Sequence, residues 1–474
     1  MPILQEVDVP ALDPGRFEAV LTAEQYARFR DAARAARQRF AGTTIYNLSS
    51  TAYGGGVAEM LRSLLAYVRG GGLDARWLVM PASPDFFQLT KRIHNQLHGA
   101  PGDGGALDEA ARSVYEDELR AAAEELRVRV RPGECVVLHD PQTAGLAPAV
   151  RRAGAHVVWR CHVGVDEPNE LVRAAWAFLL PYVREAEALV FSRSAFVWDG
   201  LDGRCVDVIP PSLDAFSSKN VDLEAHAVRA ILAASGVLPD EPPGPARFPR
   251  QAGGDAPVTH RATMVEAAPI PPGAGVVTQV SRWDRLKDPG GVIAGFAEHV
   301  VPRADAAHLV IAGPDVAAVT DDPEGAQVLE ECRRAWAGLP EAARARIHLA
   351  CLPMQDAEEN AAIVNALQRR SDVVVQKSLA EGFGLTVAEA MWKGRPVVAS
   401  RVGGIQDQVE HGRTGLLVDD PRDLAAFGDL VATLLERPAE ADAMGRAGQA
   451  RVRDHFLGPH NLVRYAELLT ELLD

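Results

Sequence analysis

The run Ser371-Asp372-Val373-Val374-Val375-Gln376 is soon followed by Glu381-Gly382-Phe383-Gly384-Leu385-Thr386-Val387-Ala388-Glu389. The β-branched run predicts a short buried strand that ends in polar residues. The composition of residues 385–393 predicts a helix, with Gly394 at its carboxyl end, and Pro396 opens the next strand. A strand, loop, helix and strand in this order indicate a parallel α/β sheet.

The loop of this unit predicts a ligand site. Loops at the carboxyl ends of such strands deliver ligands to a helix N-terminus, whose free N–H groups favour a phosphate. Gly382 and Gly384 allow the backbone to approach a ligand closely. Glu389 lies one turn into the helix, where a carboxylate accepts hydrogen bonds from vicinal hydroxyls such as those of a ribose. An ordinary turn with two solvated acids is the alternative.

Strand and helix patterns alternate through the chain in two sets. The expected strands are residues 43–48, 75–80, 135–138, 157–162, 188–191, 206–209, 276–280, 309–313, 347–349, 371–376 and 396–399. Between the two sets, Pro239 to Pro272 is crowded with proline and glycine and lacks a hydrophobic period, which predicts a linker or insertion. We predict an α/β fold with two doubly wound Rossmann-like domains, facing a central cleft. The predicted parts are residues 1–238, 239–272, 273–450 and the C-terminal helices 451–474, which would pack back on the first domain.

Composition and charge narrow the class of protein. The chain has 474 residues, a formal net charge of -15, and 47% hydrophobic and 24% charged residues, as expected of a globular protein with more than one domain. The negative charge argues against nucleic acid and anionic membranes as partners. The amino terminus lacks the pattern of a secretion signal, and five scattered cysteines predict free thiols in the core. We expect a cytoplasmic protein.

The amino-terminal half carries two further features near expected strand ends. Gly54-Gly55-Gly56 lies between a strand and a helix and can pack against a ligand, although its spacing is not that of a dinucleotide fingerprint. His139 and His162 each end a strand, beside Asp140 and Arg160 respectively, and strand ends are where ligands gather in open sheets. A structural role for each histidine and a plain turn for the glycines are the alternatives.

Two basic residues follow the first strand of the second set. Arg282 and Lys287 flank the expected start of a helix and can neutralise a diphosphate, or they are a solvated basic turn. Because these are permanent cations and the chain has no D-x-D motif, we expect neither a metal nor another cofactor.

Together, these features resemble the retaining sugar-nucleotide glycosyltransferases of family 4, which have the GT-B fold. The resemblance rests on the paired domains, the triple glycine, Arg282 with Lys287, the Glu381 to Glu389 motif and Val402-Gly403-Gly404. Within the family, further runs resemble those of the trehalose glycosyl-transferring synthases, namely residues 54–59, Phe86-Phe87, Thr90-Lys91, His94-Asn95, 139–142, 159–162 and 381–393. That resemblance implies transfer of glucose from ADP- or UDP-glucose to free glucose, reversibly, to give α,α-trehalose.

The resemblance also implies roles for individual residues. The catalytic group would be His162, Arg282, Lys287 and Glu381. The residues binding the donor would be Gly55, Gly56, Arg282, Lys287, Glu381, Gly382, Phe383, Gly384, Leu385 and Glu389. The residues binding the acceptor would be Lys91, His94, Asn95, Asp140 and Gln142. The departing phosphate would take the acceptor's proton, while the protein supplies positioning and charge stabilisation.

Two alternatives stay open from the sequence. A retaining trehalose phosphorylase, or another family 4 enzyme with a different acceptor, would use the same scaffold, because a fold does not fix a function. A non-catalytic protein that binds sugar nucleotides is the alternative from another class. The expected partners are small sugars and a sugar nucleotide, and the sequence also allows a homodimer.

Overall fold

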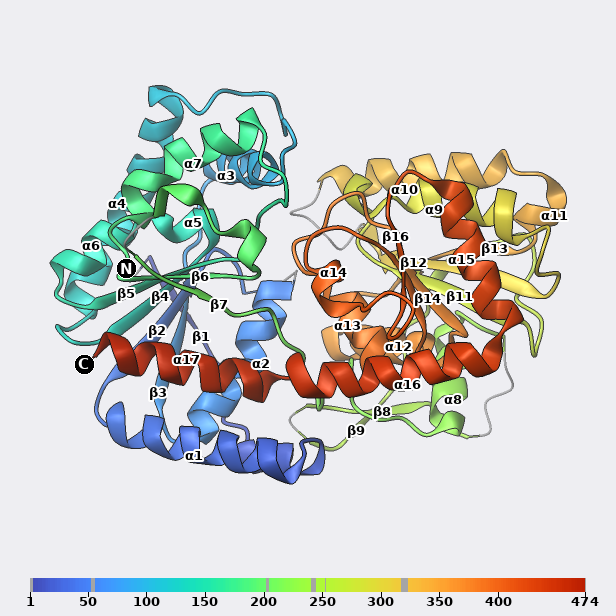
Figure 1. Cartoon of the computed structure of the whole chain (residues 1–474), viewed down its shortest axis with the longest axis horizontal. Coiled ribbons are helices and arrows are strands. Elements are labelled where there is room, and N and C mark those ends of the chain that lie inside the picture. Colours follow the sequence, from blue (N-terminus) through green and yellow to red (C-terminus); the bar gives the residue numbers. More distant parts are fainter. Residues whose placement is uncertain are drawn as a thin grey trace. The chain divides into compact units, whose positions relative to one another are not determined.

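The computed structural model describes residues 3–52, 56–201, 204–239, 244–251, 253–316 and 323–473. The chain forms two compact units (Figure 1), the first built from Met1–Ser212 and Phe456–Asp474 and the second from Leu213–His455. In the parts of the chain described, no helix combines the length and the apolar character needed to cross a membrane.

The first unit holds a sheet of seven strands in the order β1-β3-β2-β4-β5-β6-β7. All neighbours pair in parallel except β1, which is antiparallel to β3 at the edge. The strands are β1 (Gln5–Val7), β2 (Thr44–Ser49), β3 (Asp74–Val79), β4 (Cys135–His139), β5 (His156–Cys161), β6 (Ala188–Phe191) and β7 (Cys205–Val208). The helices are α1 (Ala23–Arg39), α2 (Gly56–Gly70), α3 (Pro84–Leu97), α4 (Glu109–Arg129), α5 (Asp140–Ala144), α6 (Ala147–Arg152), α7 (Glu170–Val183) and α17 (Gly458–Leu472), with 3₁₀ turns η1 (Pro14–Ala19), η2 (Ser194–Phe196) and η3 (Asp199–Leu201).

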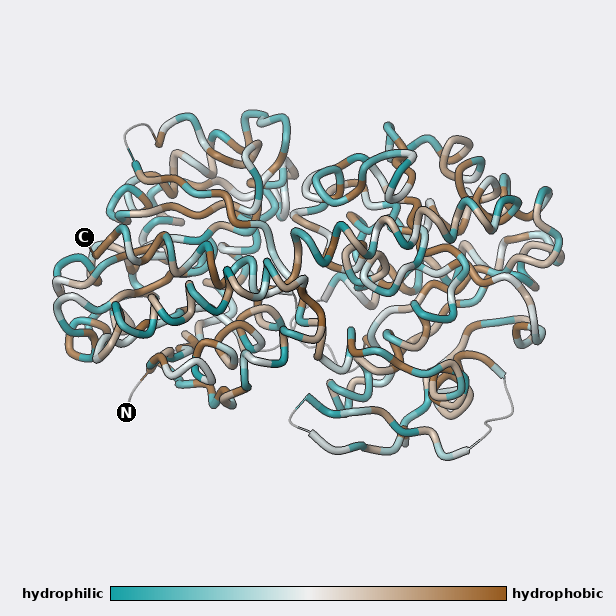
Figure 2. The backbone as a smooth tube through the Cα atoms, turned by 60° about the horizontal axis from the view of Figure 1, so that its bottom comes forward, coloured by the Kyte–Doolittle hydropathy of each residue, from teal (hydrophilic) through white to brown (hydrophobic). Residues whose placement is uncertain are grey.

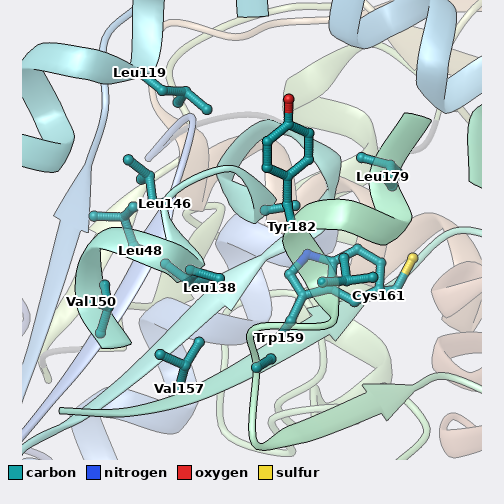
Figure 3. Close-up of a cluster of buried hydrophobic side chains, with 14 of the residues drawn as sticks. Leu48, Leu119, Leu138, Leu146, Val150, Val157, Trp159, Cys161, Leu179 and Tyr182 are labelled. Atoms are coloured by element: carbon teal, nitrogen blue, oxygen red, sulfur yellow. The ribbon is translucent and has the colours of Figure 1, made fainter. Parts of the chain in front are cut away.

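Alternate residues of the first sheet enter different cores, because successive side chains of a strand point to opposite faces. Val136 and Leu138 of β4 pack with α3, α4 and α7, whereas Cys135 and Val137 pack with α1 and α17. Figure 3 shows part of the first of these cores, with Leu138 and Trp159 from the strands near Leu179 and Tyr182 of α7. Burial on both faces explains why the central strands β4 and β6 are largely apolar.

The second unit has a sheet of the same kind, in the order β10-β13-β12-β11-β14-β15-β16, with β10 antiparallel at the edge. Its strands are β10 (Thr263–Val265), β11 (Gly275–Val280), β12 (Ala307–Pro314), β13 (Ile347–Leu352), β14 (Val373–Gln376), β15 (Val397–Ser400) and β16 (Leu416–Val418), and β8 (Arg247–Pro249) pairs separately with β9 (Asp255–Pro257). Its helices are α8 (Ala225–Ser235), α9 (Pro289–Gly295), α10 (Pro323–Ala337), α11 (Glu341–Arg344), α12 (Ala357–Arg370), α13 (Leu385–Trp392), α14 (Ile405–Gln408), α15 (Leu424–Glu436) and α16 (Pro438–His455), with the 3₁₀ turn η4 (Arg285–Lys287) and the π-helical turn η5 (Phe296–Val300).

Side chains along the strands of the second sheet also point alternately to two different cores. Val277 and Ile311 enter a core shared with α9, α10 and α15, and Val276 and Val310 enter one shared with α8 and α12. Figure 2 shows hydrophobic and hydrophilic residues interleaved along the helical coils, as amphipathic covering helices require.

Three features differ from the sequence predictions. The units divide after Ser212, so that residues 213–238, including α8, pack with the second unit and not the first. Residues 239–272, predicted to be a linker or insertion without regular structure, include the short strands β8, β9 and β10. Four cysteines are buried as predicted, but Cys205 is exposed, because it starts the edge strand β7.

Candidate functional site

The predicted site residues lie where the strand order of each sheet reverses. In the first sheet β2 lies between β3 and β4, and in the second β11 lies between β12 and β14. Ligands of open α/β sheets bind outside the carboxyl ends of strands at such points. His139 ends β4, Lys287 follows β11, and Glu381 follows β14. Each unit therefore has a candidate ligand site of its own at the position that its topology favours.

In the second unit, Lys287 and Glu381 are brought together from loops after neighbouring strands. The Lys287 ammonium donates to Glu381 Oε2 at 2.6 Å, and Ser378 Oγ donates to the same oxygen at 3.2 Å. The backbone of Lys287 is fixed as well, because its carbonyl accepts a hydrogen bond from Gln279 Nε2 at 3.0 Å. Arg282 lies on the same loop, with its side chain 47% exposed and 3.5 Å from the Asp284 carboxylate. Two cations of the predicted diphosphate site thus surround the carboxyl end of β11.

The Glu381 loop rests on the glycine turn that follows β15. Gly403 has φ +48°, and a Cβ there would lie 1.7 Å from the carbonyl oxygen of Glu381. Gly404 N–H donates to the Gly382 carbonyl at 3.0 Å, and Gln408 Nε2 donates to the Phe383 carbonyl. These contacts hold the backbone of residues 381–383 from one side, which explains the need for glycine at 403.

The α13 helix begins at Leu385, with Gly384 at its N-cap in the left-handed region at φ +84°. No cap side chain covers the first turn of this helix among the residues described. Glu389 is 2% exposed on this helix. One of its oxygens, Oε1, lies 3.5 Å from Lys219 Nζ, while no described residue donates a hydrogen bond to Oε2.

Three charged residues near this site were missed by sequence reasoning. Lys377 is fully buried directly after β14, and its ammonium donates to the Asp288 carboxylate and, at 2.6 Å, to the Pro421 carbonyl. Lys393 is buried at the end of α13, where burial lowers its pKa to about 7. Lys219 lies in a loop far from Glu389 in sequence. Of the three, only Lys377 could have been proposed as a site residue from the sequence, because it directly follows a predicted strand.

In the first unit, the two predicted histidines are neighbours. Their rings stack with centroids 5.6 Å apart, and His139 Nδ1 lies 3.3 Å from His162 Nε2. The other nitrogen of His139 contacts Asn47 Oδ1 of β2 at 3.0 Å. A chain of hydrogen-bonding groups therefore crosses the carboxyl ends of β2, β4 and β5.

Burial keeps both imidazoles neutral. It lowers the pKa of His139 to about 3 and that of His162 well below the usual value, and the positive charge of Arg160 lowers both further. Arg160 itself is fully buried and donates to the Phe191 carbonyl at 3.5 Å. Neutral rings can exchange hydrogen bonds with sugar hydroxyls without adding charge.

Asp140 supports this pair through the backbone. It has φ +63°, and its carboxylate accepts a hydrogen bond from the backbone N–H of His162 at 2.8 Å. Burial raises the pKa of Asp140 to about 6. Asp140 therefore contacts the pair through the backbone of His162, and among the described residues neither imidazole is hydrogen-bonded to Asp140 or Arg160.

The remaining predicted acceptor residues come from two elements that pack together, α3 and α5. Lys91 is exposed, while His94, Asn95 and Gln142 are partly buried. Gly56 begins α2, whereas Gly54 and Gly55 lie outside the described residues. Phe383 and Leu385 flank Gly384 at the start of α13.

Comparison with known proteins gives one family match in each unit. Residues 47–198 match the family "Trehalose synthase, N-terminal domain", and residues 261–451 match "Glycosyl transferases group 1". Trehalose synthases of Pyrococcus horikoshii and Rubrobacter xylanophilus are 30% and 32% identical, over 96% of this chain and 95% and 96% of theirs. A trehalose phosphorylase of Pleurotus pulmonarius is 25% identical over 81% of this chain and 51% of its own.

Solved structures agree on the fold. The α,α-trehalose-phosphate synthase (UDP-forming) of Burkholderia xenovorans, in complex with glucose-6-phosphate, superposes with a TM-score of 0.66 at 15% identity, covering 91% of this chain and 100% of that one. The fold is that of a GT-B glycosyltransferase. The chain belongs to the trehalose synthase family. It is therefore a glycosyltransferase of trehalose metabolism.

Proposed function

We propose that the protein transfers glucose from a nucleoside diphosphate glucose, ADP- or UDP-glucose, to free glucose and forms α,α-trehalose with retention of configuration. The observation that carries the proposal is the grouping of Lys287, Arg282 and Glu381 after β11 and β14, followed along the chain by α13 with the buried carboxylate of Glu389. Cations suit a leaving diphosphate, and a carboxylate oxygen without a partner suits ribose hydroxyls.

In the proposed reaction, the bond between the anomeric carbon and the diphosphate oxygen breaks. A new bond forms on the same face to the anomeric oxygen of the acceptor glucose, whose proton passes to the departing diphosphate. Lys287 and Arg282 stabilise the charge that develops on that diphosphate, and such preorganised groups are commonly worth several kcal/mol. Neutral His162 would hydrogen-bond the transferred sugar, and Glu381 would hold Lys287 in place.

The acceptor would be held by the polar groups of α3 and α5. A site built around sugar hydroxyls discriminates against acceptors that lack them, because its buried polar groups would go unpaired. His94, Asn95, Asp140 and Gln142 are the partly buried members of this set, and exposed Lys91 lies beside them in sequence.

We propose further that catalysis needs no metal, because Lys287 and Arg282 supply the positive charge that a divalent cation would otherwise bring to the diphosphate. The rate should be unchanged after treatment with EDTA. Activity that disappears with EDTA and returns with Mg²⁺ or Mn²⁺ would contradict this proposal.

The test of the reaction uses ¹³C-labelled glucose with unlabelled ADP- or UDP-glucose, followed by NMR of the products. We expect labelled α,α-trehalose and free nucleoside diphosphate. A phosphorylase, which the relative from Pleurotus pulmonarius makes the second candidate, would instead release glucose 1-phosphate from trehalose and inorganic phosphate. A β-linked product, or nucleotide binding without turnover, would also overturn the proposal.

A further inference from the structure

Glu389 is a buried acid whose charge needs a partner. Its side chain is 3% exposed, and a carboxylate so removed from water is costly unless a cation or hydrogen-bond donors compensate. The ammonium of Lys219 lies 3.5 Å from Oε1, while Oε2 accepts no hydrogen bond from any residue that the structure describes. One oxygen is thus paired with a cation, and the other is left for a ligand.

Lys393 does not take this role, although it lies on the same helix. Its ammonium donates to Gln368 Oε1 at 2.8 Å, to Asn220 Oδ1 at 3.1 Å and to the backbone carbonyl of Glu389 at 3.2 Å. None of these acceptors is the Glu389 carboxylate. Lys219 is therefore the cation that the structure pairs with that carboxylate.

The loop that carries Lys219 is fastened to the helices around the site. Asn365 Nδ2 of α12 donates to the carbonyls of Ser218 at 3.1 Å and Val221 at 2.8 Å. Trp392 Nε1 of α13 donates to the carbonyl of Asn220 at 3.2 Å. The backbone on both sides of Lys219 is thereby held against the helix that bears Glu389, which limits where its ammonium can go.

We infer that Lys219 is a positioning residue for recognition of the donor's ribose. It holds Oε1 of Glu389, and so presents Oε2 as a charged acceptor to the ribose hydroxyls. The inference rests on the proposed function, since it requires a nucleoside diphosphate donor. It also explains why this loop, which follows the last strand of the first unit, packs with the second unit.

The experiment measures binding of ADP and UDP, and of their 2′,3′-dideoxy forms, by calorimetry. A hydrogen bond to a charged group changes Kd by about 10- to 100-fold, so the wild-type protein should prefer the ribose form by a ratio in this range. Lys219→Met should lose most of that preference while binding the dideoxy form nearly as well as the wild type. Lys219→Arg should retain the preference, and Arg334→Met, at an exposed position on α10, should match the wild type.

A double substitution distinguishes an effect through Glu389 from a general loss of stability in Lys219→Met. Because Lys219 acts through Glu389, adding Lys219→Met to Glu389→Gln should leave the ribose preference of Glu389→Gln unchanged. A further loss of ribose preference in the double variant would overturn the role of Lys219, as would equal weakening of both nucleotide forms by Lys219→Met. Either result would leave the proposed function standing. A wild-type protein that binds neither ADP nor UDP would overturn the proposed function and this role with it.

Discussion

If the proposed function is correct, Lys287 is the side chain of the second unit whose loss should slow turnover most. Lys287→Ala removes the ammonium beside Glu381 and leaves the developing diphosphate charge without a fixed donor. We expect kcat to fall about 10²–10³-fold, and Arg282→Ala to lower it severely as well. Steady-state kinetics with Arg334→Ala as control check this, and a wild-type kcat for Lys287→Ala would contradict the assignment.

If Glu389 binds the donor's ribose as proposed, it should behave differently from Lys287, because ribose binding would contribute equally to the ground state and the transition state. Removing such an interaction raises KM with little change in kcat. We therefore expect Glu389→Ala to raise the donor KM by about 10-fold or more, with kcat within a few-fold of the wild type. A large fall in kcat at saturating donor would place Glu389 nearer to the reacting bond.

The histidine pair predicts a titration result. Burial, followed by the charge of Arg160, keeps the pKa of both His139 and His162 below 6.5. In NMR spectra of histidine-labelled protein, both rings should therefore titrate well below pH 6.5. Arg160→Met should raise both pKa values, but not to 6.5, since burial is the larger cause. A pKa at or above 6.5 for either ring in the wild type would contradict the buried pair.

The Glu381 loop and the glycine turn beneath it form a single structural element, and Gly403 is where it is most easily broken. A Cβ at Gly403 would overlap the Glu381 carbonyl, whereas one at Gly412, which also has positive φ, would contact nothing within 4 Å. Gly412→Ala is thus a control for backbone strain alone, about 1 kcal/mol. We expect Gly403→Ala to lower kcat/KM at least 10-fold and Tm more than Gly412→Ala does. Equal effects of the two substitutions would show that the contact is unimportant.

At the scale of single elements, the sequence predicted those strands that a local pattern of residues determines. The apolar runs predicted the central parallel strands, because both faces of each are buried. It did not predict β1, β10 or β16, which are only three residues long and take their structure from the neighbouring strand. Nor did it predict Lys219, whose contact with Glu389 joins segments that no short-range spacing relates.

At the scale of the whole molecule, composition predicted that there are two units but placed their boundary elsewhere. Proline and glycine crowd residues 239–272, yet the units divide after Ser212, because α8 packs on α12 and the loop before it is bonded to Asn365. Such a boundary is set by tertiary contacts, and local composition does not report them. The return of the chain to the first unit at Phe456 is fixed in the same way, because Leu468 and Leu469 of α17 are buried in one core with Ala36 of α1.

Stability of the second unit should depend on pH through a buried histidine pair. His308 Nδ1 lies 3.0 Å from His348 Nε2, and His348 Nδ1 lies 2.9 Å from Glu266 Oε2, linking β12, β13 and the segment after β10. Burial lowers the pKa of each histidine to about 4, the neighbouring Arg346 lowers that of His308 further, and burial raises the pKa of Glu266. The contact with Glu266 is therefore a hydrogen bond from a neutral imidazole.

The sign of the effect follows from these depressed histidine pKa values. Above pH 6.5 the imidazoles are neutral in both folded and unfolded chains, so these histidines do not lower the free energy of unfolding there. As the pH falls from 6.5 towards 4, these histidines become protonated in the unfolded chain but stay neutral in the folded one. By pH 5 each histidine therefore lowers the free energy of unfolding by on the order of 2 kcal/mol. Urea unfolding at pH 7.5 and pH 5 should show this loss. His308→Gln, which removes one of the two imidazoles, should lose less stability than the wild type over the same interval, and an equal loss would mean that the pair does not govern the acid response.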